Sequence, residues 1–236
     1  MQGALRWLLV VCALAALPAA AFAARPFEDS MAQRTLACTA CHGEQGRAGP
    51  DGYYPRLAGK PAGYLLHQLQ NFREGRRHYP LMQGLLDNLD EPYLRAIANH
   101  FSAQEVPYPA PAKNTASPQE LERGRQLVQQ GDAQRGLPAC TSCHGTQLTG
   151  VNPDIPGLLG LPADYLNAQL GGWQTGQRRA HAPDCMARIA QKLEPADISA
   201  VARWLSAQPV PADAHPAARR PAPTPLTADL RCGSAP

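Results

Sequence analysis

Two copies of one pentapeptide carry the most distinctive chemistry of this 236-residue chain, Cys-Thr-Ala-Cys-His at 38–42 and Cys-Thr-Ser-Cys-His at 140–144. Two thiols at this spacing reach the two vinyl groups of one haem, and the adjacent histidine then lies under the iron as its proximal ligand. A redox-active dithiol needs no histidine there, and C-x-x-C pairs about a hundred residues apart are far from the usual zinc spacing. The motifs therefore predict two covalently bound haem c groups. The predicted thioether cysteines are Cys38, Cys41, Cys140 and Cys143, and the predicted proximal iron ligands are His42 and His144.

The second axial ligand of each predicted iron separates an electron carrier from a catalyst. Met82 and Met186 lie 44 and 46 residues after the first cysteine of their motifs, at matching places in the two halves. A lone methionine usually fills a core, but two at equivalent positions indicate iron ligands, each expected in a loop just before the last helix of its half. His/Met ligation raises the reduction potential and leaves no site for a substrate, which favours a carrier. The rival ligands are His78, His100 and His181. Bis-histidine ligation at one of the two centres is therefore an alternative.

Two further pairs of residues recur around the predicted haem sites. Pro55 and Pro156 follow the proximal histidines by 13 and 12 residues. A backbone carbonyl at these positions is expected to accept the Nδ1–H bond that orients each imidazole. The arginine pairs at 76–77 and 178–179 either balance haem propionates or lie in solvent, as arginine pairs at helix ends often do.

Sequence similarity between the two halves extends well beyond the cysteines. Six residues from Tyr64 to Arg77 recur 101 positions later, and six from Met82 to Phe101 recur 104 positions later. An ordered repeat of this length indicates two homologous domains in tandem. The Pro-rich stretch between them is typical of a stiff, extended linker. The predicted organisation is a signal peptide (1–23), an N-terminal domain (24–102), a linker (103–118), a C-terminal domain (119–206) and a Pro/Ala-rich tail (207–236).

Helical signals dominate both halves, and no segment shows the sustained two-residue alternation of a strand. Leu65 and Phe72 share one face of a predicted helix. Asp90 and Pro92 are expected to open the last helix of the first half, as Glu194-Pro195 opens its counterpart. The predicted fold class is therefore all-α. Each domain is small enough for its own core to be marginal, and a covalently held haem would fill that deficit.

Composition and the N-terminal residues exclude several classes of protein. A single long apolar run near the start, followed by Ala21-Phe22-Ala23, predicts a secretory signal peptide cleaved before Ala24. A retained N-terminal anchor helix is the alternative, and a polytopic membrane protein is excluded. With 17% charged residues, a formal net charge of +3 and no basic stripe, nucleic-acid binding is not expected. An apolar fraction of 44% argues against a disordered chain.

Taken together, these motifs resemble those of the dihaem cytochrome c4 family. The resemblance rests on C-x-x-C-H-G, residues 54–59, the pattern from Tyr64 to Arg77 and Met82, with counterparts in the second half, and it covers about residues 35–206. It implies two class I cytochrome c folds that face each other about a pseudo-twofold axis. It also implies a periplasmic carrier, soluble or membrane-associated, with no catalytic residues. Its implied redox partners are a dehydrogenase or a bc1-type donor, and a haem-copper oxidase as acceptor.

Cys185 and the 30-residue tail with Cys232 depart from that family pattern. Cys12 is expected to leave with the signal peptide, and four thiols are expected to bond to haem, so these two cysteines remain. Two remaining cysteines in an exported protein indicate a disulfide. The alternative is that Cys185, beside Met186, is itself an iron ligand. Two other functions therefore stay open: an electron-accepting subunit of a periplasmic dehydrogenase, or a small haem enzyme (a peroxidase or a sulfur-compound oxidase) with one open or Cys-ligated haem.

Overall fold

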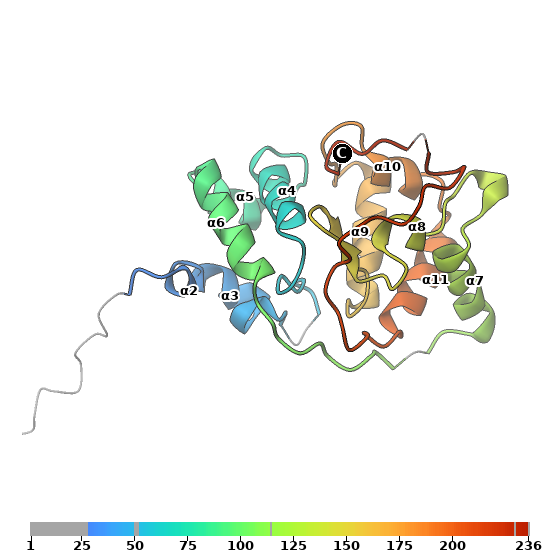
Figure 1. The fold of residues 1–236 in the computed structure, drawn as a ribbon, viewed down its shortest axis with the longest axis horizontal. Helices are drawn as coiled ribbons and strands as arrows, with labels where there is room; N and C mark the ends of the chain where they lie inside the picture. Colours follow the sequence, from blue (N-terminus) through green and yellow to red (C-terminus); the bar gives the residue numbers. More distant parts are fainter. Residues whose placement is uncertain (1–27, 50–51, 114, 229, 236) are drawn as a thin grey trace, which may run out of the picture.

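The computed structural model describes residues 28–49, 52–113, 115–228 and 230–235, so the predicted signal peptide lies outside the described residues. Within these ranges the chain is helical, as predicted, and forms two domains that lie side by side (Figure 1). The first contains α2 (Met31–Arg34), α3 (Leu36–His42), η2 (Glu44–Gly46), α4 (Ala62–Arg73), α5 (Pro80–Leu86) and α6 (Glu91–Ser102). The second contains α7 (Pro118–Gln129), η3 (Ala133–Arg135), α8 (Thr141–His144), β1 (Gly150–Val151), β2 (Ile155–Pro156), α9 (Ala163–Thr175), α10 (Cys185–Ala190) and α11 (Pro195–Ser206). β1 and β2 form a short antiparallel pair.

The last helix of each domain organises its core. α6 packs on α4, and α11 packs on α7 and α9. As predicted, Asp90 caps α6 by accepting a hydrogen bond from Tyr93 N at 2.9 Å, and α11 begins at Pro195. The buried residues of the first core are Leu65, Leu66, Phe72, Leu86, Leu94, Ile97, Ala98 and Phe101. Those of the second are Leu127, Val128, Leu137, Leu148, Leu159, Leu161, Leu166, Val201, Ala202 and Leu205.

The two predicted ligand methionines lie on short helices, and the expectation that each lies in a loop was wrong. Met82 is the third residue of α5, and Met186 is the second residue of α10. α5 starts with Pro80, whose fixed φ suits the first helical position. α10 is capped by Asp184, which accepts a hydrogen bond from Ala187 N at 3.0 Å. In both cases residues next to the methionine start the helix. Each methionine therefore lies in the first turn of a short helix.

The segment between the domains is fastened to the first domain by one buried arginine. Arg56 donates hydrogen bonds to the carbonyls of Val106 and Pro107, the latter at 3.0 Å. Its guanidinium also lies 3.9 Å from the centroid of the Tyr108 ring. The same ring leaves no room for a Cβ at Gly160 of the second domain. The connection is therefore packed against both domains along the path that Figure 1 shows.

The interface between the domains repeats one set of contacts on both sides. Arg77 donates to Gln68 Oε1 at 3.1 Å and to Gln169 Oε1 at 2.5 Å. Arg178 donates to Gln169 Oε1 at 2.6 Å and to Gln68 Oε1 at 3.2 Å. Each glutamine oxygen thus accepts from one arginine of each domain. Because these residues correspond in the sequence repeat, the domains meet about a pseudo-twofold relation.

Aromatic rings and the backbone support these arginines. Arg77 lies 4.4 Å from the Phe72 ring centroid, and Arg178 lies 3.8 Å from that of Trp173. Arg178 is only 7% exposed, so of the two alternatives left open by the sequence, the solvent-exposed one does not hold for Arg178. Beside it, Arg179 N donates to the carbonyl of Arg76 at 2.8 Å. The arginine pairs therefore hold the two domains together.

We expect Arg178→Lys to destabilise the interface by about 1.5–3 kcal/mol, because a lysine cannot donate to both glutamines in the fork geometry. The measurement is the midpoint of urea unfolding of the haem-loaded protein. Arg179→Lys is the matched control, because its side chain is exposed and its interdomain hydrogen bond comes from the backbone. Equal shifts in both variants would show that the forked contact adds nothing.

Candidate haem centres

The two predicted proximal histidines end the helices that carry their motifs. α3 ends at His42 and α8 ends at His144, and both side chains are buried. The next residue has a positive φ in each case, 74° at Gly43 and 87° at Gly145, a region that favours glycine. A Cβ at Gly43 would also collide with the carbonyl of Ala48. Glycine therefore lets the chain turn away at once while the imidazole stays buried.

A proline carbonyl orients each imidazole, as predicted. Nδ1 of His42 donates to Pro55 O at 2.8 Å, and Nδ1 of His144 donates to Pro156 O at 2.8 Å. Since a carbonyl can only accept, the proton is on Nδ1, and the lone pair of Nε2 is left to bind a metal. Burial lowers the pKa of both histidines. This favours the neutral imidazole, which is the form that ligates iron.

The surroundings of the motif cysteines suit thioethers better than a redox dithiol. Burial raises the pKa of Cys140 to about 12, and it also raises the pKa of Cys38 and Cys143. A reactive dithiol needs a thiol with a lowered pKa, because the thiolate is the nucleophile. A thioether sulfur carries no charge, so burial costs it little. The environment therefore fits covalent haem attachment.

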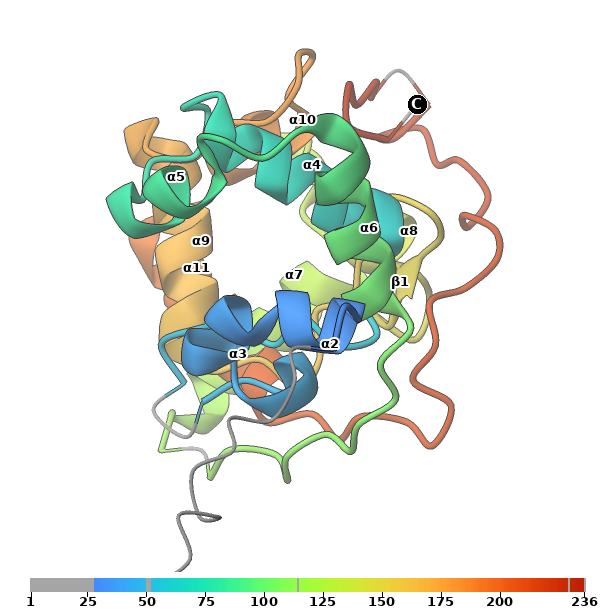
Figure 2. The same cartoon turned by 90° about the vertical axis from the view of Figure 1, so that its left-hand side faces the viewer.

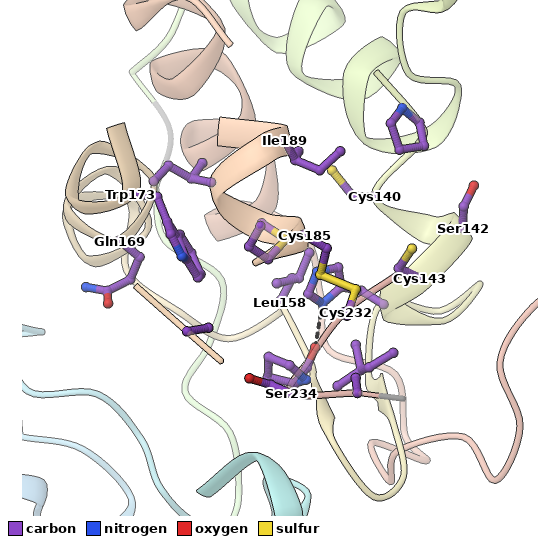
Figure 3. Close-up of a pocket in the computed structure, with 18 of the residues that line it drawn as sticks. Cys140, Ser142, Cys143, Leu158, Gln169, Trp173, Cys185, Ile189, Cys232 and Ser234 are labelled. Carbon is purple, nitrogen blue, oxygen red and sulfur yellow. Dashed lines mark hydrogen bonds between the residues drawn. A yellow bond between two sulfur atoms is a disulfide. The ribbon is translucent and has the colours of Figure 1, made fainter. Parts of the chain in front are cut away.

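A cavity of about 300 Å³ adjoins the second motif. Its mostly apolar wall includes Cys140, Cys143, His144 and Met186, so the predicted attachment sites and both predicted axial ligands share one cavity. Figure 3 shows Cys140, Ser142 and Cys143 on one side of this pocket and Gln169 and Trp173 on the opposite side. This arrangement suits a large apolar group that is bonded at the cysteine side.

The predicted residues of the first centre also lie around one core. Cys38 and Met82 both pack against the buried cluster formed by α4, α5 and α6. The ring of Tyr54 lies edge-on to buried His42, with 6.0 Å between the centroids. The first half therefore places the same residue types around its core as the second half does.

The interdomain arginines provide a place for the propionates of a haem. Arg178 lines the cavity, and its guanidinium lies against the Trp173 ring and donates to Gln169. In Figure 3 these two residues lie on the side away from the cysteines. Vinyl and propionate groups lie at opposite edges of a haem, so the propionates would point toward this side. The side-chain acceptors of these two guanidinium groups are neutral: the oxygens of Gln68 and Gln169 and, for Arg178, also the hydroxyl of Tyr64. The guanidinium charges thus remain available to an anionic group, which fits haem.

The rival histidines occupy varied surroundings. His78 is exposed, and the ring of His100 packs on Phe101 with 5.1 Å between the centroids. His181 lines the second cavity, but its Nε2 accepts a hydrogen bond from Arg76 Nη2 at 3.0 Å. A nitrogen engaged in this way is not free to bind iron. The geometry therefore favours Met186 over His181 in the second domain.

Sequence reasoning missed Lys60, which reaches the second cavity from the first domain. Burial lowers the pKa of Lys60 to about 8, and its ammonium lies 6.0 Å from the Tyr64 ring centroid. The counterpart of Lys60 in the repeat is Leu161. Because neighbouring positions of the repeat differ as well, such as Arg56 and Gly157, no local signal singled out Lys60.

The two cysteines outside the motifs are bonded to each other. Cys185 and Cys232 form a disulfide with 5.0 Å between their Cα atoms, which confirms the predicted pairing. The sulfur of Cys185 is thereby engaged, which argues against its alternative role as an iron ligand.

A family model described as "Cytochrome c" matches residues 30–118 and again residues 121–208. The chain belongs to the cytochrome c family. Cytochrome c4 of Pseudomonas aeruginosa is 33% identical over 174 residues, which are 73% of this chain and 84% of that protein. The crystal structure of reduced cytochrome c4 from Pseudomonas stutzeri superposes with a TM-score of 0.64 and 32% identity, over 75% of this chain and 95% of that one. The tandem arrangement is thus that of a dihaem cytochrome c4.

Relatives with a different name are equally similar. The "Thiosulfate dehydrogenase electron acceptor" of Thiomonas intermedia strain K12 is 36% identical over 201 residues, which are 85% of this chain and 91% of that protein. A structure of thiosulfate dehydrogenase from Marichromatium purpuratum matches with a TM-score of 0.66 and 31% identity over 75% of this chain. The match spans only 39% of that longer chain.

Membership of the family settles the cofactor and the general role. Cytochrome c domains bind covalently attached haem c, so this cytochrome carries two haem c groups. It is a cytochrome c4-like electron carrier, and it acts with redox partners. In the part of the chain that the structure describes, no helix is both long and apolar enough to span a bilayer.

We expect Met82→Ala and Met186→Ala each to remove part of the absorption band that reports methionine bound to ferric haem. Each should also lower the potential of one haem by a sizeable fraction of the roughly 0.8 V range that axial ligands cover, because the thioether favours ferrous iron. Spectroelectrochemical titration measures both effects. Met31→Ala is the control, because Met31 packs on the first core but precedes the motif. An unchanged band in Met82→Ala or Met186→Ala would refute that ligand.

Proposed function

We propose that this cytochrome carries single electrons in the periplasm through two His/Met-ligated haems. His42 and Met82 would ligate the first iron, and His144 and Met186 the second. The observation that carries this proposal is the matched geometry of the two halves. Each holds a buried histidine with Nδ1 engaged by a proline carbonyl, and each holds a methionine on a short helix just before the last one. Two filled coordination spheres suit a carrier and leave no substrate site.

The protein's contribution to electron transfer is to fix the positions of the histidines and to bury them. The haem, once bound, supplies a one-electron couple. The carbonyls of Pro55 and Pro156 keep the imidazoles in one tautomer and orientation, so that little has to move when the charge of the centre changes. At the interface, Arg77 and Arg178 hold the domains together. Their charges also offset the propionates that this side would receive.

The disulfide separates the carrier from the haem-enzyme alternative. A second centre with a thiolate ligand would need the sulfur of Cys185 to be free, and it is bonded to Cys232. His181, the other candidate in that cavity, accepts from Arg76. Both observations support Met186 as the ligand and a closed second centre.

Two kinds of donor fit this carrier. The similarity to thiosulfate dehydrogenase electron acceptors over most of their length favours a sulfur-oxidising dehydrogenase as electron donor. The similarity to cytochrome c4 is compatible with a bc1-type donor. A terminal haem-copper oxidase is the proposed acceptor in both cases. The disulfide and the predicted signal peptide support a periplasmic location, since disulfides persist in oxidising compartments.

The first test of this function is the visible spectrum of the dithionite-reduced protein before and after addition of carbon monoxide. We expect neither haem to shift, because both irons keep two strong axial ligands. Met186→Ala serves as the positive control and should bind the gas at one haem. A change in the spectrum of the unmodified protein would mean that carbon monoxide binds an open iron, and it would favour the haem-enzyme alternative.

The donor is tested by mixing the oxidised protein with thiosulfate and the catalytic subunit of a thiosulfate dehydrogenase. We expect both haems to become reduced, and thiosulfate without the subunit should leave them oxidised. Absence of reduction, together with reduction by a bc1-type complex, would exclude the thiosulfate dehydrogenase as donor and keep the carrier role.

A further inference from the structure

The segment after α11 folds back over the second domain. It leaves α11 at Ser206, passes along the outside of β1 and α8, and ends near α10 (Figures 1 and 2). Ala217 pairs with β1, since its N donates to Gly150 O at 2.9 Å and its carbonyl accepts from Asn152 N at 2.9 Å. Near the C-terminal end, the disulfide at Cys232 joins the segment to α10. The returning segment is therefore tied down at both ends.

Residues of this segment form part of the wall of the second cavity. Lining positions include Arg220, Pro221, Thr227, Leu230 and Ala235. They share the cavity with the second C-x-x-C-H motif and with Met186. Figure 3 shows Cys232 and Ser234 in this pocket together with Cys143. The segment thus contacts the space that a haem bonded to Cys140 and Cys143 must occupy.

The fit of the last residues is close. Gly233 N donates to Pro183 O at 2.9 Å, and a Cβ at Gly233 would collide with the carbonyl of Ala182. Arg220 Nη2 donates to Ala235 O at 2.5 Å, and Ala235 is buried. The C-terminal end is therefore packed into the second domain.

The disulfide acts on the residue next to the predicted ligand. Cys185 is the first residue of α10 and Met186 is the second. In the first domain, the position that corresponds to Cys185 is Leu81, which is 63% exposed. Met82 thus lies on a helix whose neighbouring position is open to solvent. The two centres share their ligand types and differ in this cover.

We propose that the C-terminal segment is a working part of the second haem centre: its residues 220–228 and 230–235 cover the cavity, and the Cys185–Cys232 bond holds Met186 in position. This inference rests on the proposed ligation of the second iron by Met186. The cover excludes water from the second haem and favours the less charged ferrous state, so its removal lowers the potential of that haem. The bond also keeps small ligands from displacing Met186.

The test uses the full-length haem-loaded protein and its Cys185→Ala/Cys232→Ala variant, which leaves no free thiol near the iron. Imidazole is the probe, because it competes with methionine for ferric haem. Met186→Ala identifies the spectrum of the second haem. We expect imidazole to bind the second haem of the double variant about tenfold more tightly or better, the scale on which a disulfide restrains a chain. We also expect the potential of that haem to fall, while the first haem keeps its affinity and potential.

A neighbouring pair of arginines gives a milder test that leaves the disulfide in place. Both arginines are exposed, but Arg220→Ala removes a residue that lines the cavity and donates to Ala235 O, whereas Arg219→Ala changes a neighbour outside the lining. We expect only Arg220→Ala to increase imidazole binding at the second haem. This comparison replaces the first if the double variant does not fold.

Two results would overturn the proposal: no change at the second haem in the double variant or in Arg220→Ala, or equal changes at both haems. Failure of the proposed function looks different, because the unmodified protein would then bind carbon monoxide at an open iron. If the unmodified protein binds no carbon monoxide and the second haem does not respond to the variants, the proposed cover is refuted and the carrier function stands.

Discussion

The hydrogen bond from a buried histidine to a proline carbonyl is the contact around which each domain is arranged. It requires the helix that carries the cysteines to stop at the histidine, and a glycine with positive φ makes that stop possible. It also requires the loop with Pro55 or Pro156 to pass close beside that helix end. The bond leaves Nε2 as the free nitrogen, so it also sets which atom of each histidine would bind a haem iron.

The contact between the domains is a hydrogen-bond network to which both domains contribute the same residue types. Two arginines and two glutamines from corresponding positions satisfy one another across the interface. Because each glutamine oxygen accepts from both arginines, neither domain completes the network alone. The positive charges gather at the side of the cavity where haem propionates would lie, so the same residues join the domains and receive the charge of the cofactor.

The two halves are alike in their predicted iron ligands and unlike in their surroundings. The second domain receives Lys60 from its neighbour and a returning C-terminal segment that the disulfide fastens. The first domain shows Leu81 and Leu85 exposed on the helix of Met82, beside which the C-terminal segment does not run. The two haem centres thus have the same predicted ligands but different access to solvent. Such a difference is one way to set which of the two haems is reduced first.

The sequence by itself determined the cofactor, the tandem repeat, the helical class and the proline carbonyls, and it predicted the attachment cysteines, because all of these depend on residue types at fixed short spacings. The pairing of Cys185 with Cys232 also followed from counting, since export left two thiols unassigned. The sequence pointed to loops at Met82 and Met186, where Pro80 and Asp184 in fact start short helices. Only the tertiary structure showed that Arg77 and Arg178 bond across the interface, that Lys60 enters the cavity of the other domain, and that residues of the C-terminal segment line this cavity. These contacts join residues far apart in the chain, and their formation depends on how two finished domains pack, which no local pattern encodes.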